Sequence, residues 1–297
     1  MAVKNSILVI RLGALGDIIH NFPTMHALRA HYKDSKIVFL TTPPFQSLLE
    51  KSPYFDEIWT VGRWSSRQIF KWIAFAKKLK AQNFDHVYDL QRSDRTRIMS
   101  YLAPGSLKQK WYGKKASPHI PVFGELAIAN IPKPEHIDTS WLTSDITKFR
   151  LPPRYAVLVP GCSPTHPYKR WPARHYAKIA TDLRAAGITS VLIGTDAEKE
   201  VLKDIQRCAP SVLNLCGQTS LFNIAEICRQ AQIAIGNDTG PMHIAGIVGC
   251  PVISLFSGRT NPAKSKPLGQ RVVTLQSQDI AEIHPDSVFT KINQIIL

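Results

Sequence analysis

The sequence predicts an α/β protein made of two parallel-sheet units that follow each other along the chain. Strand-like and helix-like segments alternate at first, the alternation loosens over a proline-containing stretch, and it then resumes. The strand-like segments are almost continuously apolar, which is typical of parallel strands buried on both faces. At 297 residues, with 44% hydrophobic side chains, the chain is long enough for two domains with substantial cores.

In the first unit, four apolar segments are expected as strands: 6–12, 36–42, 57–61 and 84–91. The segments between them have the apolar spacing of helices and cover 17–32, 43–52 and 66–82. The stretch VIRLGALGDIIHNFP reads as a buried strand, a glycine-containing turn and a helix that opens on Asp17. A carboxylate at this junction has three possible roles: it caps the helix, binds a ligand or accepts a proton.

Prolines and short polar segments occupy the stretch between about residues 104 and 153, so a domain boundary is expected there. The predicted domains are 1–150 and 151–297. In the second, strands are expected at 155–161, 190–194, 212–217, 233–238 and 251–258, and helices at 174–187, 197–208, 221–230, 240–249 and 285–297. We allow for the last helix packing back on the first domain.

The formal net charge of +15 favours an anionic partner, which is a nucleic acid, an anionic membrane surface or a phosphorylated small molecule. The basic residues are spread over both units without a recognisable nucleic-acid module, so no nucleic-acid partner is expected. Five cysteines without a C-x-x-C pair suit free thiols in a reducing compartment. No apolar run reaches the roughly 18 residues of a membrane span. A cytoplasmic protein is expected, with peripheral binding to the cytoplasmic face of a membrane as an alternative.

Three segments at strand ends of the second unit carry candidate chemistry. In GNDTGPMHIAG, Asp238, Thr239 and Gly240 precede a helix whose first N–H groups are open to an anion. The simpler interpretation is a capped helix, with His243 as a packed side chain. In PGCSPTHPYKRWP, Lys169 stands just before a helix start, where the dipole disfavours cations and a bound anion would relieve the cost. A solvated surface cation is the alternative.

The third segment, LIGTDAEKEVL, places Glu198 in the first turn of a helix. Acidic residues are favoured there in any case, although a carboxylate at a strand end also accepts ribose hydroxyls. Because open parallel sheets bind ligands at the carboxyl ends of their strands, the three segments together predict a nucleotide diphosphate site. The chain has no G-x-x-x-x-G-K-[ST] motif, which excludes a P-loop NTPase, and RLGALGD is not the G-x-G-x-x-G of nicotinamide sites.

Five segments in this order resemble glycosyltransferase family 9, the lipopolysaccharide heptosyltransferases: RLGALGDIIHNFP, YDLQRSDRTR, KRWP, GNDTGPMHIAG and LFSGRTNP. The resemblance implies the GT-B fold, in which two Rossmann-like α/β/α domains face each other across a cleft. It also implies an inverting, metal-independent transfer of a sugar, heptose from ADP-heptose, to an anionic lipopolysaccharide core or related glycolipid, with no cofactor. The alternatives are a non-catalytic sugar-nucleotide-binding protein and another GT-B-like enzyme such as a sugar-nucleotide epimerase.

The resemblance also assigns roles to individual residues. It makes Asp17 the catalytic base, Lys169 a contact of the donor diphosphate and Glu198 the ribose ligand. The other donor-binding residues that it implies are Thr165, Asp238, Thr239, Gly240 and His243. The segment LFSGRTNPAKSKPLG keeps only part of the family's glycine-proline-threonine pattern, so contacts with the donor base stay open.

Basic residues of the first unit are candidates for binding an anionic acceptor: Arg63, Arg92, Arg95 and Arg97. A solvated basic face is the alternative. A second basic group is interleaved with two aromatic residues and is predicted to contact the anionic inner-membrane surface: Lys108, Lys110, Lys114 and Lys115, with Trp111 and Tyr112.

Overall fold

The computed structural model describes residues 5–65, 67–105, 111–113, 131–132, 134 and 137–296. It divides the chain into two compact units, unit 1 (Met1–Trp141) and unit 2 (Leu142–Leu297). The boundary therefore lies before the predicted position at 150/151. The reason is packing: Leu142 and Phe149 are buried, and the carbonyl of Leu142 accepts a hydrogen bond from Arg229 of unit 2.

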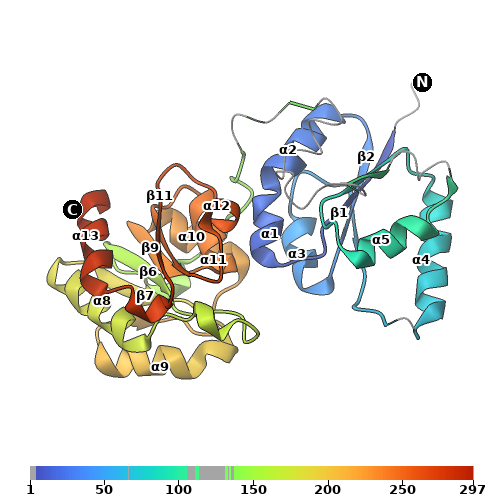
Figure 1. Cartoon of the computed structure of the whole chain (residues 1–297). Helices are drawn as coiled ribbons and strands as arrows, with labels where there is room; N and C mark the ends of the chain where they lie inside the picture. The colour runs from blue at the N-terminus through green and yellow to red at the C-terminus, as the bar shows by residue number, and fades with distance from the viewer. Residues whose placement is uncertain are drawn as a thin grey trace. The chain divides into compact units, whose positions relative to one another are not determined.

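Unit 1 is built on a five-stranded sheet of order β3-β2-β1-β4-β5, in which all pairs are parallel. The strands are β1 (Ser6–Ile10), β2 (Lys36–Thr41), β3 (Glu57–Thr60), β4 (His86–Asp89) and β5 (Trp111–Tyr112). The helices are α1 (Leu15–His20), α2 (Phe22–His31), α3 (Gln46–Glu50) after the 3₁₀ turn η1 (Pro43–Phe45), α4 (Ile69–Gln82) and α5 (Asp94–Leu102). Helices α1 to α3 cover one face of the sheet, and α4 and α5 cover the other (Figure 1).

Unit 2 is built on a six-stranded, wholly parallel sheet of order β11-β10-β9-β6-β7-β8. Its strands are β6 (Tyr155–Val159), β7 (Thr189–Leu192), β8 (Leu213–Asn214), β9 (Ile233–Asn237), β10 (Val252–Ser257) and β11 (Val272–Ser277). Its helices are α8 (Ala173–Ala185), α9 (Lys199–Cys208), α10 (Leu221–Gln230), α11 (Gly240–Ile247), α12 (Pro262–Ser265) and α13 (Pro285–Ile296). Short 3₁₀ turns are η2 (Thr147–Phe149), η3 (Pro167–Lys169), η4 (Asp196–Glu198) and η5 (Ile280–Glu282).

The order of the strands in unit 2 reverses between β6 and β9, which lie next to each other in the middle of the sheet. The chain leaves these two strands in opposite directions across the sheet. This topological switch point is where open α/β sheets bind ligands. The predicted donor residues Lys169 and Asp238 follow β6 and β9, respectively.

The first helix departs from the prediction in two ways. It begins at Leu15 rather than at Asp17, and it ends at His20, with α2 starting separately at Phe22. The break follows from Pro23, which has no N–H to continue the hydrogen-bond ladder. The side chain of Asn21 donates instead to the carbonyl oxygen of Asp17 at 2.7 Å and closes the end of α1.

The terminal helix α13 packs on the core of unit 2, and its packing on the first domain stays a prediction. Val288 and Ile292 are fully buried there, beside α8 and β10. In the part of the chain that the structure describes, no helix is both long and apolar enough to cross a bilayer.

The aromatic part of the predicted membrane patch is also wrong. Trp111 belongs to β5 and is buried in the hydrophobic core of unit 1. The ring of Tyr112 stacks on that of Tyr88, with the centroids 4.9 Å apart. The remaining members of this patch lie outside the described residues: Lys108, Lys110, Lys114 and Lys115.

Candidate active site

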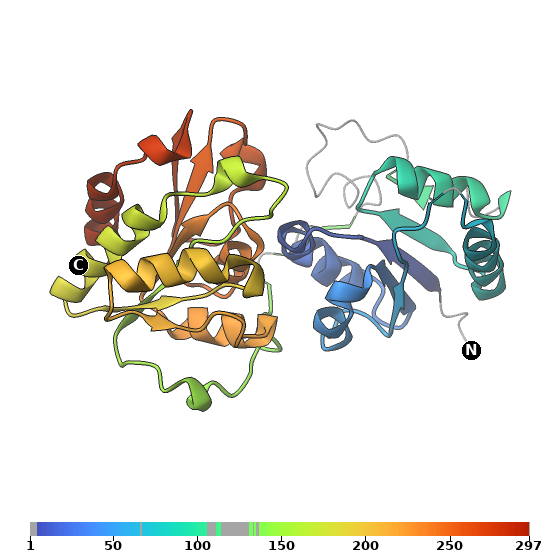
Figure 2. The same ribbon diagram turned by 90° about the horizontal axis from the view of Figure 1, so that it is seen from below.

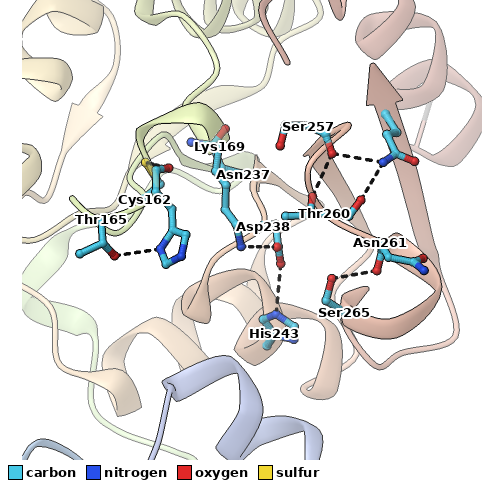
Figure 3. A network of polar contacts seen from close by, with 12 residues as sticks. Cys162, Thr165, Lys169, Asn237, Asp238, His243, Ser257, Thr260, Asn261 and Ser265 are labelled. Carbon is cyan, nitrogen blue, oxygen red and sulfur yellow. Dashed lines mark hydrogen bonds and ion pairs between the residues drawn. The ribbon is translucent and has the colours of Figure 1, made fainter. Parts of the chain in front are cut away.

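The centre of the site in unit 2 is an ion pair that joins the loops after β6 and β9 (Figure 3). The ammonium nitrogen of Lys169 lies 2.6 Å from Oδ2 of Asp238. His243, one turn inside α11, has its Nε2 3.7 Å from Oδ1 of the same carboxylate. Asp238 and His243 are buried, whereas the Lys169 side chain is 20% exposed. The buried carboxylate of Asp238 therefore fixes the Lys169 side chain, part of which is exposed to solvent.

The pair fixes the charge of Asp238. Burial alone would raise the pKa of this carboxyl, but hydrogen bonds from His243 and Lys169 and their positive charges outweigh it, so the pKa lies below its ordinary value. The carboxylate is thus ionised at neutral pH. It can hold the Lys169 ammonium in one position, and the remaining N–H donors of that group are available to an anion.

The start of α11 provides a second anion-binding element beside this pair. Thr239 precedes the helix in an extended conformation, and its side chain makes no capping hydrogen bond. Gly240 is the first helical residue and Pro241 the second. Backbone N–H groups at such a terminus, together with the helix dipole, favour a phosphate.

Asn237 ties the two loops of the switch point together, a role that the sequence did not indicate. Its side-chain Nδ2 donates to the carbonyl oxygens of Pro160 and Gly161 at 2.8 and 3.1 Å. Its Oδ1 accepts from the backbone N–H of Trp171 at 3.1 Å and from the Tyr176 hydroxyl at 3.0 Å. The amide is fully buried, so these four bonds satisfy it and brace the segment that carries Lys169.

Glu198 lies at the same edge, in the turn η4 after β7. Its Oε2 accepts from the backbone N–H and the hydroxyl of Thr195, which is the capping role that the sequence offered as the simpler interpretation. The side chain also lies against the β6 loop, because a Cβ on Gly161 would come within 2.8 Å of its Cγ. Ribose binding by Glu198 stays a prediction.

Thr165 lies in the loop between β6 and α8, and its hydroxyl contacts neither Lys169 nor Asp238. Its hydroxyl is exposed and contacts Nδ1 of His166 at 2.9 Å (Figure 3). It also contacts Oγ of Ser163 at 2.8 Å. A phosphate-contacting role stays a prediction for this hydroxyl.

The loop after β10, where the sequence departs from the family pattern, is braced from β11. The side-chain amide of Gln276 donates to the carbonyl oxygens of Ser257 and Thr260 at 3.1 and 2.8 Å (Figure 3). Arg259, between them, places its guanidinium 5.2 Å from the ring centroid of Tyr168, the neighbour of Lys169. Sequence analysis missed this second cation, although its position after an apolar strand was a usable signal.

In unit 1, the loop after β1 holds the carboxylate of Asp17. Its Oδ2 lies 2.7 Å from an Arg11 nitrogen and accepts the backbone N–H of Ala14 at 3.0 Å. Arg11 also donates to the carbonyl oxygen of Leu90 after β4, so it links the two central loops at this edge. The Asp17 side chain is 54% exposed, which leaves it accessible to a substrate.

Gly13 allows this turn to be so tight. Its φ of +133° is rarely adopted by other residues, and a Cβ there would come within 2.8 Å of the Phe45 ring. The turn presents Ala14 and Asp17 at the start of α1.

The four predicted acceptor arginines do not form one group. Burial lowers the pKa of Arg95, and the positive charge of Arg63 lowers it further, so these two lie close together. Arg95 also donates to the carbonyl oxygen of Gly62. Arg92, in a left-handed conformation with φ of 49°, follows β4 at the same edge of the sheet. Arg97 instead pairs with Asp94 at 2.8 Å on the exposed surface of α5, which fits the alternative of a solvated basic residue.

Among the residues that the structure describes, no three His, Cys, Asp or Glu side chains are grouped so that they could hold a metal ion.

Two Rossmann-like units, each with charged side chains at the carboxyl edge of its parallel sheet, are typical of GT-B glycosyltransferases, which use nucleotide sugars. A model of glycosyltransferase family 9 (heptosyltransferase) matches residues 129–293, more than half of the chain. The protein belongs to this family.

Individual relatives agree with the family. The chain is 29% identical to lipooligosaccharide heptosyltransferase 2 of Haemophilus influenzae over 153 residues, which is 44% of each protein. It is 24% identical to the lipopolysaccharide core heptosyltransferase OpsX of the same organism over 289 residues, 88% of this chain and 81% of that one. The structure of ADP-heptose lps heptosyltransferase II of Escherichia coli has a TM-score of 0.79 and 21% identity, and the match covers 99% of this chain and 98% of that one. This likeness confirms the predicted GT-B fold.

Proposed function

We propose that this protein is an inverting glycosyltransferase that transfers heptose from ADP-heptose to the lipopolysaccharide core or a related anionic glycolipid. The observation that carries the proposal is the Lys169–Asp238 pair at the switch point of unit 2, beside the open start of α11. Family membership and the names of the relatives support the choice of heptose, ADP and lipopolysaccharide.

Unit 2 stabilises the leaving group in this proposal. When the bond between the anomeric carbon and the diphosphate breaks, the electron pair leaves with ADP and negative charge grows on the phosphate oxygens. The Lys169 ammonium and the N–H groups at the start of α11 are fixed donors for that charge, with Thr165 as a further hydroxyl donor. Fixed donors of this kind lower a barrier because they need no reorganisation during the reaction. Asp238 and His243 position Lys169. The Glu198 carboxylate accepts hydrogen bonds from the ribose hydroxyls of the donor.

Unit 1 supplies the base. The acceptor hydroxyl attacks the anomeric carbon in a single displacement, which inverts the configuration, and its proton passes to the Asp17 carboxylate. Arg11 and the Ala14 N–H hold that carboxylate in place. A carboxylate is a weak base, but it suffices when the proton moves late, after the attacking oxygen has become acidic.

We extend the proposal to a reaction without a metal ion or cofactor, in which the lysine and the amides take the part that a divalent cation plays in other enzymes. The anionic acceptor would meet Arg63, Arg92 and Arg95 beside Asp17, and the enzyme would work in the cytoplasm, peripherally on the cytoplasmic face of the inner membrane.

The proposal is tested with the purified chain in two steps. Thermal unfolding is followed with ADP-heptose, UDP-glucose and ADP alone; a ligand at about 100 times its Kd adds roughly 2.7 kcal/mol of stability. Transfer to core lipopolysaccharide that lacks heptose is then measured by mass spectrometry, with and without EDTA. We expect stabilisation by ADP-heptose and a mass increase of one heptose in both cases. Turnover of the donor without acceptor would indicate an epimerase, and donor binding without transfer would indicate a binding protein.

A further inference from the structure

Two helices of unit 1 expose large apolar side chains to solvent. Within the described ranges, all exposed large hydrophobic residues belong to α4 or α5: Ile69, Phe70, Ile73, Ile98, Tyr101 and Leu102. Phe70 is 83% exposed. Scattered apolar residues are normal on a protein surface, but a group of them on neighbouring elements marks an interaction site.

These side chains are not part of the core of unit 1. Both helices already have an inner apolar face: Phe75 and Leu79 of α4, Met99 of α5 and Ala103 at the end of α5 are buried in the same hydrophobic cluster. The two helices lie next to each other on that side of the sheet (Figures 1 and 2). The exposed residues therefore form a second, outward apolar face that folding of the unit does not require.

The outward face is also cationic. Helix α4, IFKWIAFAKKLKAQ, carries four lysines and no acidic residue. Lys71, Lys77 and Lys80 are exposed, and Lys78 lies over the ring of Trp59, 3.7 Å from its centroid. The one acidic residue of α5, Asp94, is paired with Arg97. Aromatic and aliphatic side chains interleaved with lysines are the composition of helices that lie in the interface of anionic bilayers.

We propose that this outward face binds an anionic lipid bilayer. We call it the α4–α5 face and define it by its apolar and its cationic members: Ile69, Phe70, Ile73, Ile98, Tyr101 and Leu102, with Lys71, Lys77 and Lys80. The apolar side chains enter the headgroup region, and the lysines contact lipid phosphates. The proposal rests on the proposed function, because it explains how the enzyme reaches a glycolipid acceptor.

The position of the face in unit 1 fits this role. Helices α4 and α5 begin at the carboxyl edge of the sheet, directly after the loops that carry Arg63 and Arg92. Asp17 follows β1 at the same edge. The first turns of α4, with Phe70 and Ile73, are therefore on the side of unit 1 where the acceptor sugar would be deprotonated.

Charge favours a bilayer over a second copy of this chain. In a symmetric dimer through this face, the lysines of one copy would approach those of the other, and like charges at an interface cost affinity. An anionic bilayer satisfies both the apolar and the cationic members at once.

The test is co-sedimentation of the full chain with vesicles of phosphatidylcholine alone and of phosphatidylcholine mixed with phosphatidylglycerol. One variant replaces the apolar members (Ile69→Ser, Phe70→Ser, Ile73→Ser), and a second replaces the cations (Lys71→Gln, Lys77→Gln, Lys80→Gln). The matched control removes three exposed cations from α9 of unit 2 (Lys199→Gln, Lys203→Gln, Arg207→Gln). All changes are at exposed positions, so circular dichroism is expected to confirm folding.

We expect the wild type and the α9 control to bind mixed vesicles, and binding to weaken as salt is raised. Each variant of the α4–α5 face should lose at least about tenfold in partition coefficient. No binding by the wild type, or equal losses in the α9 control, would overturn the proposal. So would sedimentation velocity showing a lipid-free dimer that the serine variant abolishes, because the face would then be a self-association surface.

Donor binding separates this proposal from the proposed function. The variants of the α4–α5 face should keep the wild-type thermal shift with ADP-heptose and wild-type transfer to a deacylated, soluble core acceptor. If the wild type shows neither a thermal shift with ADP-heptose nor transfer to the soluble acceptor, the proposed function is wrong, independently of the result with vesicles.

Discussion

Arg11 and Asp17 form an ion pair of 2.7 Å at the carboxyl edge of unit 1, and the same guanidinium donates to the carbonyl oxygen of Leu90. Arg11 is largely buried, whereas Asp17 is about half exposed. The arginine is thus anchored in the fold and orients a carboxylate that a substrate can reach. It is a positioning residue, and Asp17 is the proposed base.

Replacing Asp17 by Asn should remove the base and retain the shape of the side chain. We expect kcat to fall by about 10²–10⁴-fold, the range for losing a general base, with the thermal shift by ADP-heptose unchanged. Asp34→Asn, an exposed aspartate of the same unit, is the control and should transfer normally. Near-wild-type turnover by Asp17→Asn would refute the assignment.

Arg11→Lys keeps the positive charge but cannot span both Leu90 and Asp17. We expect kcat to fall by about 10²-fold through misplacement of the carboxylate, with the KM for the donor unchanged. In the Asp17→Asn background the same change should have little further effect, since the group that it orients is gone. Additive losses in the double variant would mean that Arg11 acts independently of Asp17. Arg29→Lys, at another ion pair of unit 1, is the matched control.

Lys169→Ala should weaken the stabilisation of the departing diphosphate. We expect kcat to fall by about 10²–10³-fold, on the scale of losing one fixed donor, and the Kd for ADP to rise. Lys178→Ala removes another lysine of unit 2 that is paired with an aspartate, on the exposed side of α8. It should leave both quantities unchanged. Equal effects of the two variants, in isothermal titration and initial-rate assays, would show that Lys169 contributes only general charge.

The lowered pKa of Asp238 predicts a pH dependence of stability. The hydrogen bonds and charges of His243 and Lys169 outweigh the burial that raises it, so the folded state binds this proton more weakly than the unfolded chain, whose value is near 3.8. The stabilisation is therefore complete above that pH and is lost as the pH falls through the folded value. In urea unfolding, Asp238→Asn should be less stable than the wild type by about 1.5–3 kcal/mol at neutral pH, and the difference should shrink in acid. A difference that is constant with pH would contradict this interpretation.

Gly13→Ala should disturb the turn before Asp17. The positive φ and the Phe45 ring both oppose a Cβ, so we expect a loss of more than about 1 kcal/mol in the free energy of unfolding, together with reduced transfer. Gly105→Ala is the control, because no atom lies within 4 Å of its added Cβ. Equal stability of the two variants, measured by denaturant unfolding, would show that the turn tolerates a side chain.

Most of the fold could be predicted because its strands are buried on both faces and therefore appear as short apolar runs. Segments that depart from this pattern were missed. Strand β11 (Val272–Ser277) is only partly buried and lies at the edge of its sheet, and β5 has two residues. The break between α1 and α2 depends on Pro23. The spacing of apolar residues is helical on both sides of this proline, so it does not reveal the break.

The sequence predicted those parts of the site that directly follow a strand, because an apolar strand and its end can be recognised in the sequence. Lys169 and Asp238 lie far apart in the sequence, and the topology of the sheet brings them together. The contributions of Arg11 and Asn237 were not accessible, because Arg11 bonds the backbone carbonyl of Leu90 and Asn237 bonds that of Pro160, and no sequence motif reveals such contacts. Glu198 shows the reverse case, since the capping role that local sequence favoured is the one observed.

Asn237 connects the proposed donor site to the interior of unit 2. The side-chain amide of this residue, next to Asp238 in the chain, donates to carbonyl oxygens in the segment leading to Lys169. It accepts from the backbone N–H of Trp171 and from the hydroxyl of Tyr176. A shift of that segment to make room for a bulkier nucleotide would break these hydrogen bonds and leave the buried amide of Asn237 without partners, which costs stability. Changes in donor preference should therefore arise at the rim, near Thr165 and Arg259, where substitution leaves the interior intact.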